Sequence, residues 1–329
     1  MIKKLRANVI VLVLPILALL IGITLFIFYQ GNGNDRREPL FVLIPKTLDQ
    51  VDFWTSLIAG AEIGANDFDV QLEILGVYSE DDIEGQNQEI LKAIEMQPDV
   101  ILLAASSATE TIPYIEQAIA AGIQVILVDS VVDKELGSGI VSTNNIEMGR
   151  ELARYARQFL NQDSQIGIIG PVQEAATAIE REQGIREGLG QYEENILKVA
   201  FGGFNYENAY ELTKQMIADA PEMNILFGIN EDSSVGAARA IHALGLENEI
   251  MLFGVDNSLE QIQFLERGVF QAIMIQKPVN MGYLAVELGV QALEGASRSE
   301  IIDSGSVLIT RDNMYLRENQ QLLFPLPGQ

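Results

Sequence analysis

The chain has 329 residues, of which 48% are apolar and 20% are charged, enough for one large or two medium-sized packed domains. Its 46 acidic and 21 basic residues give a formal net charge of −25, which excludes a protein that grips nucleic-acid phosphates through clustered Lys and Arg. The sequence has no cysteine, so it offers no disulfide, thiolate nucleophile, thiolate metal site or lipidated cysteine. Its single histidine, His242, lies among Ala and Leu on a predicted helix, where a structural or surface role is favoured over catalysis.

The first thirty residues have the pattern of a membrane anchor. Three basic residues near the start precede an uncharged stretch from Val9 to Tyr29, whose 21 residues span about 31 Å as a helix, the thickness of a bilayer core. The stretch is longer than a signal-peptide apolar region and ends without a small-residue cleavage motif. We therefore predict an uncleaved signal-anchor over residues 1–30, with a cleaved signal peptide as the alternative. Residues 31–39 form a polar linker, and the basic start places the rest of the chain on the extracytoplasmic side of the cell membrane.

Beyond the linker, short apolar runs alternate with segments of helical length. We predict ten strands, at Leu40–Ile44, Val70–Leu75, Val100–Ala104, Val125–Val128, Ile140–Val141, Ile166–Ile169, Ile196–Ala200, Ile225–Phe227, Met251–Val255 and Gln271–Ile275. We predict helices between them, at Asp52–Asp67, Asp82–Met96, Thr109–Ala121, Glu147–Gln162, Ala178–Leu189, Tyr206–Ala220, Ser233–Leu244, Leu259–Arg267 and Asn280–Leu293.

This alternation indicates an α/β fold with parallel sheets that helices cover on both faces. Ten strands are too many for one compact sheet of this length, so we expect two doubly wound parallel-sheet lobes. Ligands of such sheets bind beyond the carboxyl ends of the strands, where this chain places aromatic, acidic, amide and hydroxyl side chains. This set suits a neutral polyol, although each residue alone is explained equally well as a helix cap or a turn residue.

The sequence gives no support for an enzyme. It contains no P-loop, no G-x-S-x-G motif and no His/Cys set with metal-ligand spacing, so we expect no catalysis, no cofactor and no metal site. The adjacent acids Glu231 and Asp232 could serve as glycosidase carboxylates, but two neighbouring residues at a helix start more readily cap the helix.

Several segments carry a resemblance to a known family. They run from about Pro39 to Met314 in this order: DFWTSLIAGAE, GIQVILVDS, VSTNNIEMGRELARY, IGIIGP with EREQGIREGL, FNYENAYELTKQM, NILFGINEDSSVGAARAI, LFGVDNS, AIMIQKPVNMGYLAVE and VLITRDN. Their order and spacing resemble those of type I periplasmic sugar-binding proteins of the ribose- and galactose-binding kind. That family shares its fold with lactose-repressor-type ligand domains.

The resemblance implies two lobes that are joined by three crossings and close on a ligand in the cleft between them. Residues 40–143 and 277–302 would form the N-terminal lobe, and residues 144–276 and 303–325 the C-terminal lobe. A monomer is implied. The ligand site carried over from the family comprises Phe53, Trp54, Asp129, Ser130, Arg181, Phe204, Asn230, Asp256 and Gln276, in which the aromatic rings stack and the polar groups contact hydroxyls.

The chain departs from the family at several of these positions. Ser130 and Ile179 stand where arginines are common, and Val51-Asp52 stands in place of Asn-Pro. Arg181 could supply a cation, although in the family its position more often supports the fold. The cleft would thus hold several carboxylates and few cations. A different sugar, a polyol or a positively charged small molecule remains open as the ligand, and an anion is disfavoured.

Two functions follow from the resemblance and the anchor. The first is a membrane-anchored solute-binding protein that takes up a carbohydrate-like ligand for an ABC-type sugar permease. The alternative is a ligand-sensing partner of a membrane histidine kinase. A DNA-binding repressor would need a helix-turn-helix before the ligand domain, where this chain has the predicted membrane span.

Overall fold

The computed structural model describes residues 37–49, 52–173, 175–295 and 301–324. The predicted span Val9–Tyr29, most of the linker and Val51 lie outside these residues. Within these ranges, no helix combines the length and the apolar character needed to cross a membrane. The fold described below is that of the compact unit that begins at Leu40.

The first sheet has six parallel strands in the order β11-β5-β4-β3-β1-β2. Strand β1 pairs with the edge strand β2 on one side and with β3 on the other, and Phe41 lies in register with Leu72 and Val100. The strands are β1 (Leu40–Ile44), β2 (Gln71–Ile74), β3 (Val100–Leu103), β4 (Gln124–Val128), β5 (Gly139–Ser142) and β11 (Ile301–Asp303).

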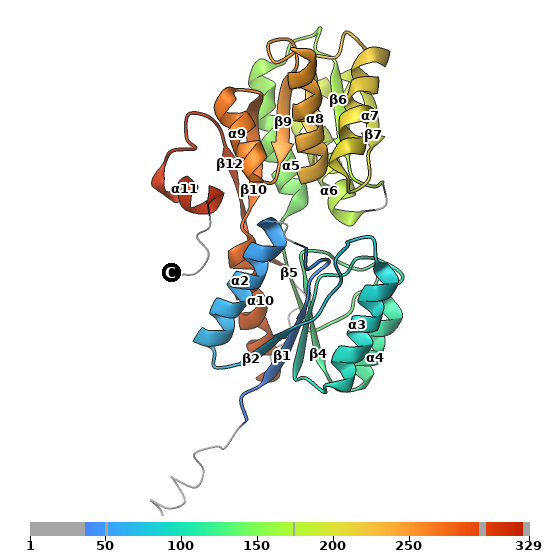
Figure 1. Ribbon diagram of the computed structural model, residues 1–329, viewed down its shortest axis with the longest axis vertical. Helices are drawn as coiled ribbons and strands as arrows, with labels where there is room; N and C mark the ends of the chain where they lie inside the picture. The colour runs from blue at the N-terminus through green and yellow to red at the C-terminus, as the bar shows by residue number, and fades with distance from the viewer. Residues whose placement is uncertain (1–36, 50–51, 174, 296–300, 325–329) are drawn as a thin grey trace, which may run out of the picture. The chain divides into compact units, whose positions relative to one another are not determined.

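Helices cover both faces of this sheet because its central strands are apolar on both sides. Phe41 and Leu43 point to the face covered by α2 (Asp52–Asp67) and α10 (Pro278–Leu293). Val42 and Ile44 point to the opposite face, covered by α3 (Ile83–Glu95) and α4 (Ile112–Ala120). These six strands and four helices are called the first lobe here (Figure 1).

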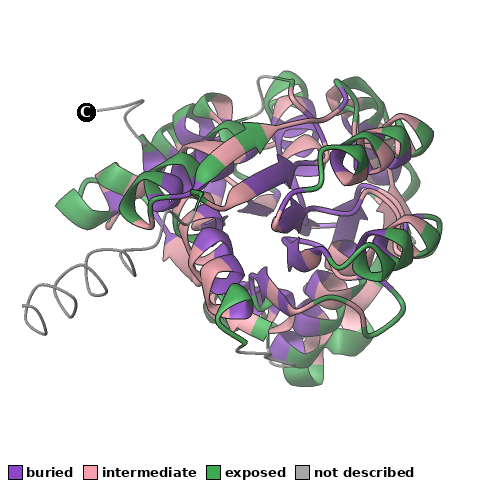
Figure 2. Ribbon diagram, turned by 90° about the horizontal axis from the view of Figure 1, so that it is seen from below, coloured by how far each residue is buried: buried purple, intermediate pink, exposed green. Residues whose placement is uncertain are grey.

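The second sheet has the order β12-β10-β9-β8-β6-β7, in which β12 is antiparallel to β10 and the other pairs are parallel. The strands are β6 (Ile166–Gly170), β7 (Ile196–Phe201), β8 (Ile225–Gly228), β9 (Met251–Val255), β10 (Phe270–Gln276) and β12 (Ser306–Ile309). One face packs against α5 (Asn145–Ala156) and α6 (Ala176–Leu189). The other packs against α7 (Tyr206–Asp219), α8 (Glu231–Leu244), α9 (Leu259–Arg267) and α11 (Arg317–Leu323). These elements, with the 3-10 turns η1 (Arg157–Phe159) and η2 (Gly190–Asn195), are called the second lobe. In Figure 2 the strands are mostly buried and the exposed residues gather on the outward faces of the helices.

Glycines allow one helix pair in each lobe to pack at close range. A Cβ atom on Gly60 of α2 would lie 2.0 Å from the carbonyl oxygen of Val279 in α10. In the second lobe, a Cβ atom on Gly184 of α6 would lie 2.0 Å from the carbonyl oxygen of Ile146 in α5. Only glycine permits these approaches, so each pair forms a tightly packed layer on one face of its sheet.

The chain passes between the lobes three times, after β5, after β10 and between β11 and β12. One buried polar cluster joins the three crossings. Thr143 Oγ1 donates to Gln276 Oε1 at 2.9 Å and lies 3.2 Å from Ser304 Oγ. Asn280 Nδ2 donates to the carbonyl oxygen of Ser304 at 2.9 Å. The three crossing segments are thus held side by side.

The predicted strands are confirmed to within one or two residues, but the prediction of ten strands was wrong. The structure adds β11 and β12, which are three and four residues long and form the edge of their sheets, and it adds the helix α11. These short segments lack the long apolar run or helical period on which the prediction relied. Helix α10 begins at Pro278 rather than Asn280, because proline fits the first turn of a helix.

Candidate functional site

A cavity of about 300 Å³ lies between the lobes, at the carboxyl ends of the strands. Its walls are loops and helix starts that follow β1, β2 and β4 of the first lobe and β6, β7, β8, β9 and β10 of the second. Eight of the nine residues implied by the resemblance line it: Phe53, Trp54, Asp129, Arg181, Phe204, Asn230, Asp256 and Gln276. Their contact with a ligand stays a prediction.

Ser130 is the residue of the implied set that does not line this cavity. Its side chain lines a smaller neighbouring cavity and donates from Oγ to Asp129 Oδ2 at 2.7 Å. The backbone turns at Asp129, whose φ is 64°, so Ser130 does not continue along the wall of the larger cavity. Its role in this structure is to hold the Asp129 carboxylate.

Two aromatic rings form part of the first-lobe wall. Trp54 is only 3% exposed and belongs to the core beneath α2, and its Nε1 donates to Glu80 Oε1 at 2.6 Å. Phe53 is half-buried and packs edge-on against Trp54, with ring centroids 4.9 Å apart and planes at 87°. The indole therefore presents an edge fixed by core packing, while Phe53 lies nearer the rim.

Each lobe places one aspartate at the same point of its sheet. Asp129 follows β4 in LVDS and Asp256 follows β9 in GVDN, and both have left-handed backbones, with φ of 64° and 72°. Their amides donate to the neighbouring strands, to Val141 O at 2.9 Å and Met274 O at 2.8 Å. A positive φ is costly for most residues and better tolerated by Asp and Asn, so this geometry aims both carboxylates into the cavity at some cost in stability.

The charged partners of these aspartates differ. Lys46 Nζ lies 3.1 Å from Asp129 Oδ2 and 5.8 Å from the centroid of the Trp54 ring. Asp256 Oδ1 accepts from Gln276 Nε2 at 2.8 Å, whereas Arg181 Nη1 lies 3.9 Å from Asp256 Oδ2. Burial raises the pKa of Asp256, and the Arg181 guanidinium opposes that rise.

Arg181 is bound mainly to the protein itself. Its Nε donates to Asn145 Oδ1 and its Nη1 to the carbonyl oxygen of Ile229, both at 2.9 Å, and the residue is 4% exposed. These bonds tie α6 to the start of α5 and to the end of β8. Arg181 thus has one edge at the cavity wall and serves chiefly to join these elements.

The start of α8 supplies two acids to the second-lobe wall. Asn230 caps the helix by accepting from Ser233 N, which leaves Glu231 and Asp232 in the first turn facing the cavity. Glu231 Oε1 accepts from the Tyr206 hydroxyl at 2.5 Å, and Asp232 Oδ2 accepts from Asn230 Nδ2 at 3.3 Å. The two acids therefore contribute to the cavity as well as to the helix start.

Burial shifts the titration of both acids. Burial, together with the charge of Asp256, raises the pKa of Glu231 to about 7, although the hydrogen bond from Tyr206 opposes the rise. Burial, followed by the charge of Glu80 in the other lobe, raises the pKa of Asp232 to about 6. Burial likewise raises the pKa of Glu80, and Lys46 opposes that rise. Burial and neighbouring negative charges thus disfavour the ionised form of several acids in the cavity.

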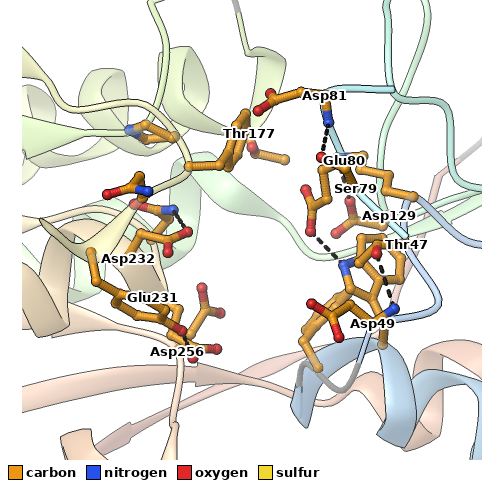
Figure 3. A pocket seen from close by; sticks show the side chains of 18 of the residues that line it. Thr47, Asp49, Ser79, Glu80, Asp81, Asp129, Thr177, Glu231, Asp232 and Asp256 are labelled. Carbon is orange, nitrogen blue, oxygen red and sulfur yellow. Dashed lines mark hydrogen bonds and ion pairs between the residues drawn. The ribbon is translucent and has the colours of Figure 1, made fainter. Parts of the chain in front are cut away.

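Overall, the lining contains seven carboxylates and two cations. Figure 3 shows Glu80, Asp81 and Asp129 on one side of the cavity and Glu231, Asp232 and Asp256 on the other. Among the described residues, no group of three His, Asp or Glu side chains is arranged to hold a metal ion. The acids are spread around the cavity and do not converge on one position.

Lys46, Glu80 and Tyr206 line the cavity but are not among the residues predicted from the sequence. Lys46 comes two residues after β1, so the rule that ligand groups follow parallel strands could have found it. Glu80 belongs to the loop after β2, and the hydrogen bond with Trp54 joins that loop to α2. Nothing local in the sequence signals that contact.

A second cavity, of about 860 Å³, lies beside the crossings and shares Gln276 with the first. It is lined mainly by apolar side chains, among them Ile63, Leu259 and Phe324. Charged and aromatic groups from both lobes converge on the first cavity, which makes that cavity the candidate ligand site.

Comparisons with known proteins agree with this geometry. The profile of a family described as "Periplasmic binding protein domain" matches residues 41–297. The D-ribose/D-allose-binding protein of Pseudomonas aeruginosa is 22% identical and aligns over 80% of this chain and 85% of its own length. The ribose import binding protein RbsB of Bacillus subtilis is 21% identical over 85% and 90% of the two chains.

Solved structures share the fold. A sugar transporter from Clostridium phytofermentans is 34% identical, with a TM-score of 0.77, over 83% of this chain and 99% of that chain. A carbohydrate transporter solute binding protein from Agrobacterium radiobacter, in complex with D-arabinose, is 20% identical, with a TM-score of 0.80, over 88% and 100% of the two chains.

Proposed function

The chain belongs to the type I periplasmic sugar-binding protein family, and we propose that it binds a small carbohydrate-like ligand on the extracytoplasmic side for ABC-type sugar uptake. One observation carries the proposal. The cavity between the strand ends of both lobes is walled by aromatic rings and by acid, amide and hydroxyl groups. Rings pack against the C–H faces of a sugar, and the polar groups bind its hydroxyls.

The size of the cavity fits this ligand class. About 300 Å³ is at the lower end of small-molecule pockets, which suits a monosaccharide-sized compound. Curated relatives are described as ribose- and allose-binding proteins, and one related structure contains D-arabinose. Binding without chemical change accords with these relatives, which are solute-binding proteins rather than enzymes.

We propose that binding acts through closure of the lobes. Residues 40–143 with 277–302 would move as one body and residues 144–276 with 303–325 as the other, about the three crossings. Gln276 supports this coupling, because its Nε2 binds Asp256 in the cavity while its Oε1 accepts from Thr143 at a crossing. A ligand that contacts Asp256 or Gln276 thereby acts on the segments about which the lobes turn.

The membrane attachment is also a proposal. The uncharged stretch Val9–Tyr29 supports an anchor that holds a monomeric binding unit beside its partner at the cell membrane. That stretch also favours the second candidate, a sensor that presents its closed form to a membrane histidine kinase, because a permanent tether suits a fixed partner. Crosslinking of the full-length protein in its native membrane distinguishes the two by the partner captured, and the capture of neither would contradict both.

A thermal-shift screen of the full-length protein in detergent tests the binding proposal. We would screen pentoses, hexoses, polyols, amino acids, polyamines and nucleosides. A ligand at a hundredfold excess over its dissociation constant stabilises the folded state by about 2.7 kcal/mol. Asp256→Asn should abolish the shift. Glu249→Gln should leave it unchanged, because Glu249 is exposed, lies before β9 at the opposite end of the strand from Asp256, and is absent from the cavity lining. No shift with any sugar or polyol would refute a carbohydrate-like ligand.

A further inference from the structure

The cavity places acids of one lobe opposite acids of the other. Glu80 and Asp81 belong to the loop after β2 of the first lobe, and Glu231, Asp232 and Asp256 belong to the second (Figure 3). The two groups affect each other, since the charge of Glu80 adds to the effect of burial in raising the pKa of Asp232. Because the groups come from separate loops around one cavity, closure of the lobes brings like charges closer together.

The two cations of the cavity are already bound to protein groups. Lys46 pairs with Asp129, and Arg181 donates to Asn145 and to the backbone of Ile229. Within the described part of the chain, no Lys or Arg nitrogen forms a salt bridge within 4.0 Å of Glu80, Glu231 or Asp232.

The hydrogen-bond donors to these three acids are neutral. They are the Trp54 indole for Glu80, the Tyr206 hydroxyl for Glu231 and the Asn230 amide for Asp232. An ionised carboxylate can accept several hydrogen bonds, so one neutral donor does not use all the acceptor sites of any of these carboxylates. The three acids therefore keep capacity for donors from a ligand.

A second observation shows what kind of group this cavity accommodates. Lys46 Nζ lies 5.8 Å from the centroid of the Trp54 ring and 3.1 Å from Asp129 Oδ2. The cavity wall thus already holds one ammonium group between an aromatic ring and a carboxylate, an arrangement that stabilises a cation both through the ring and through the charge. The wall formed by Tyr206, Glu231 and Asp232 also combines an aromatic ring with carboxylates. The Arg239 guanidinium lies 5.4 Å from the centroid of the Tyr206 ring, but Arg239 is absent from the cavity lining and forms its salt bridges with Glu207 and Glu260.

We propose that the ligand is a small polyhydroxylated compound that carries a protonated amine, of the amino-sugar class, with the amine bound among Glu80, Glu231 and Asp232. This inference rests on the proposed function and names the ligand class of that site. A neutral sugar leaves the acids of the two lobes to repel one another in the closed form. An ammonium group between them reduces that repulsion and donates charge-assisted hydrogen bonds, so it favours closure.

A metal ion fits this cavity less well than an organic cation. Among the described residues, no three acids converge closely enough to coordinate a metal. An amine on a sugar ring needs only hydrogen bonds to acids on the cavity wall, while the ring fills the rest of the cavity. A charge-assisted hydrogen bond strengthens binding about 10- to 100-fold. We therefore expect an amino sugar to bind at least tenfold more tightly than its neutral parent.

Isothermal titration calorimetry of the full-length protein in detergent tests this at pH 7.5 with matched compounds. Each pentose or hexose is compared with its amino-deoxy counterpart and with the N-acetylated form, which keeps the nitrogen on the same carbon but is larger and carries no charge. D-glucose, D-glucosamine and N-acetyl-D-glucosamine form one such set, and D-galactose, D-galactosamine and N-acetyl-D-galactosamine another. At least tenfold tighter binding of an amine supports the inference. Equal or tighter binding of a neutral parent overturns the inference alone, whereas no binding of any sugar overturns the proposed function as well.

Charge-removing variants then locate the amine. Glu231→Gln and Asp232→Asn should each reduce the preference for the amine over its neutral parent about tenfold, with little change for the parent. Glu249→Gln removes the same charge from an exposed position outside the cavity lining and should leave the preference intact. If Glu249→Gln lowers the preference as much as Glu231→Gln does, the effect arises from the net charge of the surface, and the assignment of the amine to these acids is overturned.

Discussion

Glu231→Gln should stabilise the ligand-free protein at neutral and alkaline pH. The substitution keeps the size of the side chain and an oxygen that accepts from Tyr206, and it removes a carboxylate that burial and the charges of Asp256 and Asp232 disfavour. In the wild-type protein, folding raises the pKa of Glu231 from an ordinary 4.5 to about 7. Between these pH values the folded state holds a proton that the unfolded state releases. The free energy of unfolding of the wild-type protein therefore falls as pH rises from about 4.5 to about 7 through this group.

The magnitude follows from that interval. If the Glu231 carboxylate were fully shielded from water, the free energy of unfolding would fall by about 3 kcal/mol over this pH interval. Glu231 is half-buried at the wall of a cavity, and screening by water reduces the loss to about 1–2 kcal/mol. For a chain of this size the corresponding rise in melting temperature is about 2–6 °C at pH 8. At pH 5 the difference between variant and wild type should shrink to about a quarter, because the folded protein is then protonated and the unfolded chain only partly ionised.

Scanning fluorimetry of the ligand-free proteins from pH 5 to pH 8 measures this difference directly. Glu249→Gln serves as the matched control, since it removes one acidic charge from an exposed position and should show no such pH dependence. A Glu231→Gln variant that melts at or below the wild-type temperature at pH 8 would refute the reasoning. So would a difference that stays constant with pH.

Three further predictions concern packing and backbone geometry. Trp54→Ala removes a buried indole and should lower the free energy of unfolding by about 3–5 kcal/mol in a urea titration, and a loss below about 1 kcal/mol would contradict the described packing. Asp129→Asn should be about 1 kcal/mol more stable than Asp129→Ala, because both lose the ion pair with a lysine while only Asn favours a φ of 64°, and equal stability would refute the backbone argument. Gly60→Ala should cost several kcal/mol or prevent folding, since its methyl group would lie 2.0 Å from a carbonyl oxygen of α10. Gly122→Ala faces open space at a φ of 84° and should cost only about 1 kcal/mol, so similar melting of the two variants would contradict the close helix contact.

The central strands could be predicted because each is a continuous apolar run, as in Val100–Leu103, and such runs are needed where helices cover both faces of a sheet. The short edge strands Ile301–Asp303 and Ser306–Ile309 carry no such signal, because they have only three and four residues. The first pairs with β5 and the second runs antiparallel to β10. Their pairing is a property of the assembled sheet. Local sequence therefore predicts the interior of these sheets better than their edges.

The same division applies to the candidate site. Asp129 and Asp256 could be placed in it because they directly follow parallel strands, whose carboxyl ends meet at the cleft. Glu80 could not, because the course of its loop depends on a hydrogen bond to Trp54, 26 residues away. Ser130 was assigned from the resemblance, yet it follows Asp129 and turns to the neighbouring cavity. Contacts that tertiary packing creates are the ones that sequence patterns miss.

The late arrival of α10 and β11 in the chain bears on how the protein is made. The first lobe takes its first five strands from residues before 143, but the helix that covers one of its faces spans Pro278–Leu293 and its edge strand spans Ile301–Asp303. By the time the ribosome reaches these residues, five strands of the second lobe have already been synthesised. The second lobe can therefore assemble most of its sheet while the first still exposes the apolar face that α10 covers. The lobe that is translated first thus stays incomplete until residues 278–303 have followed most of the second lobe, and during that interval its uncovered apolar face is open to aggregation.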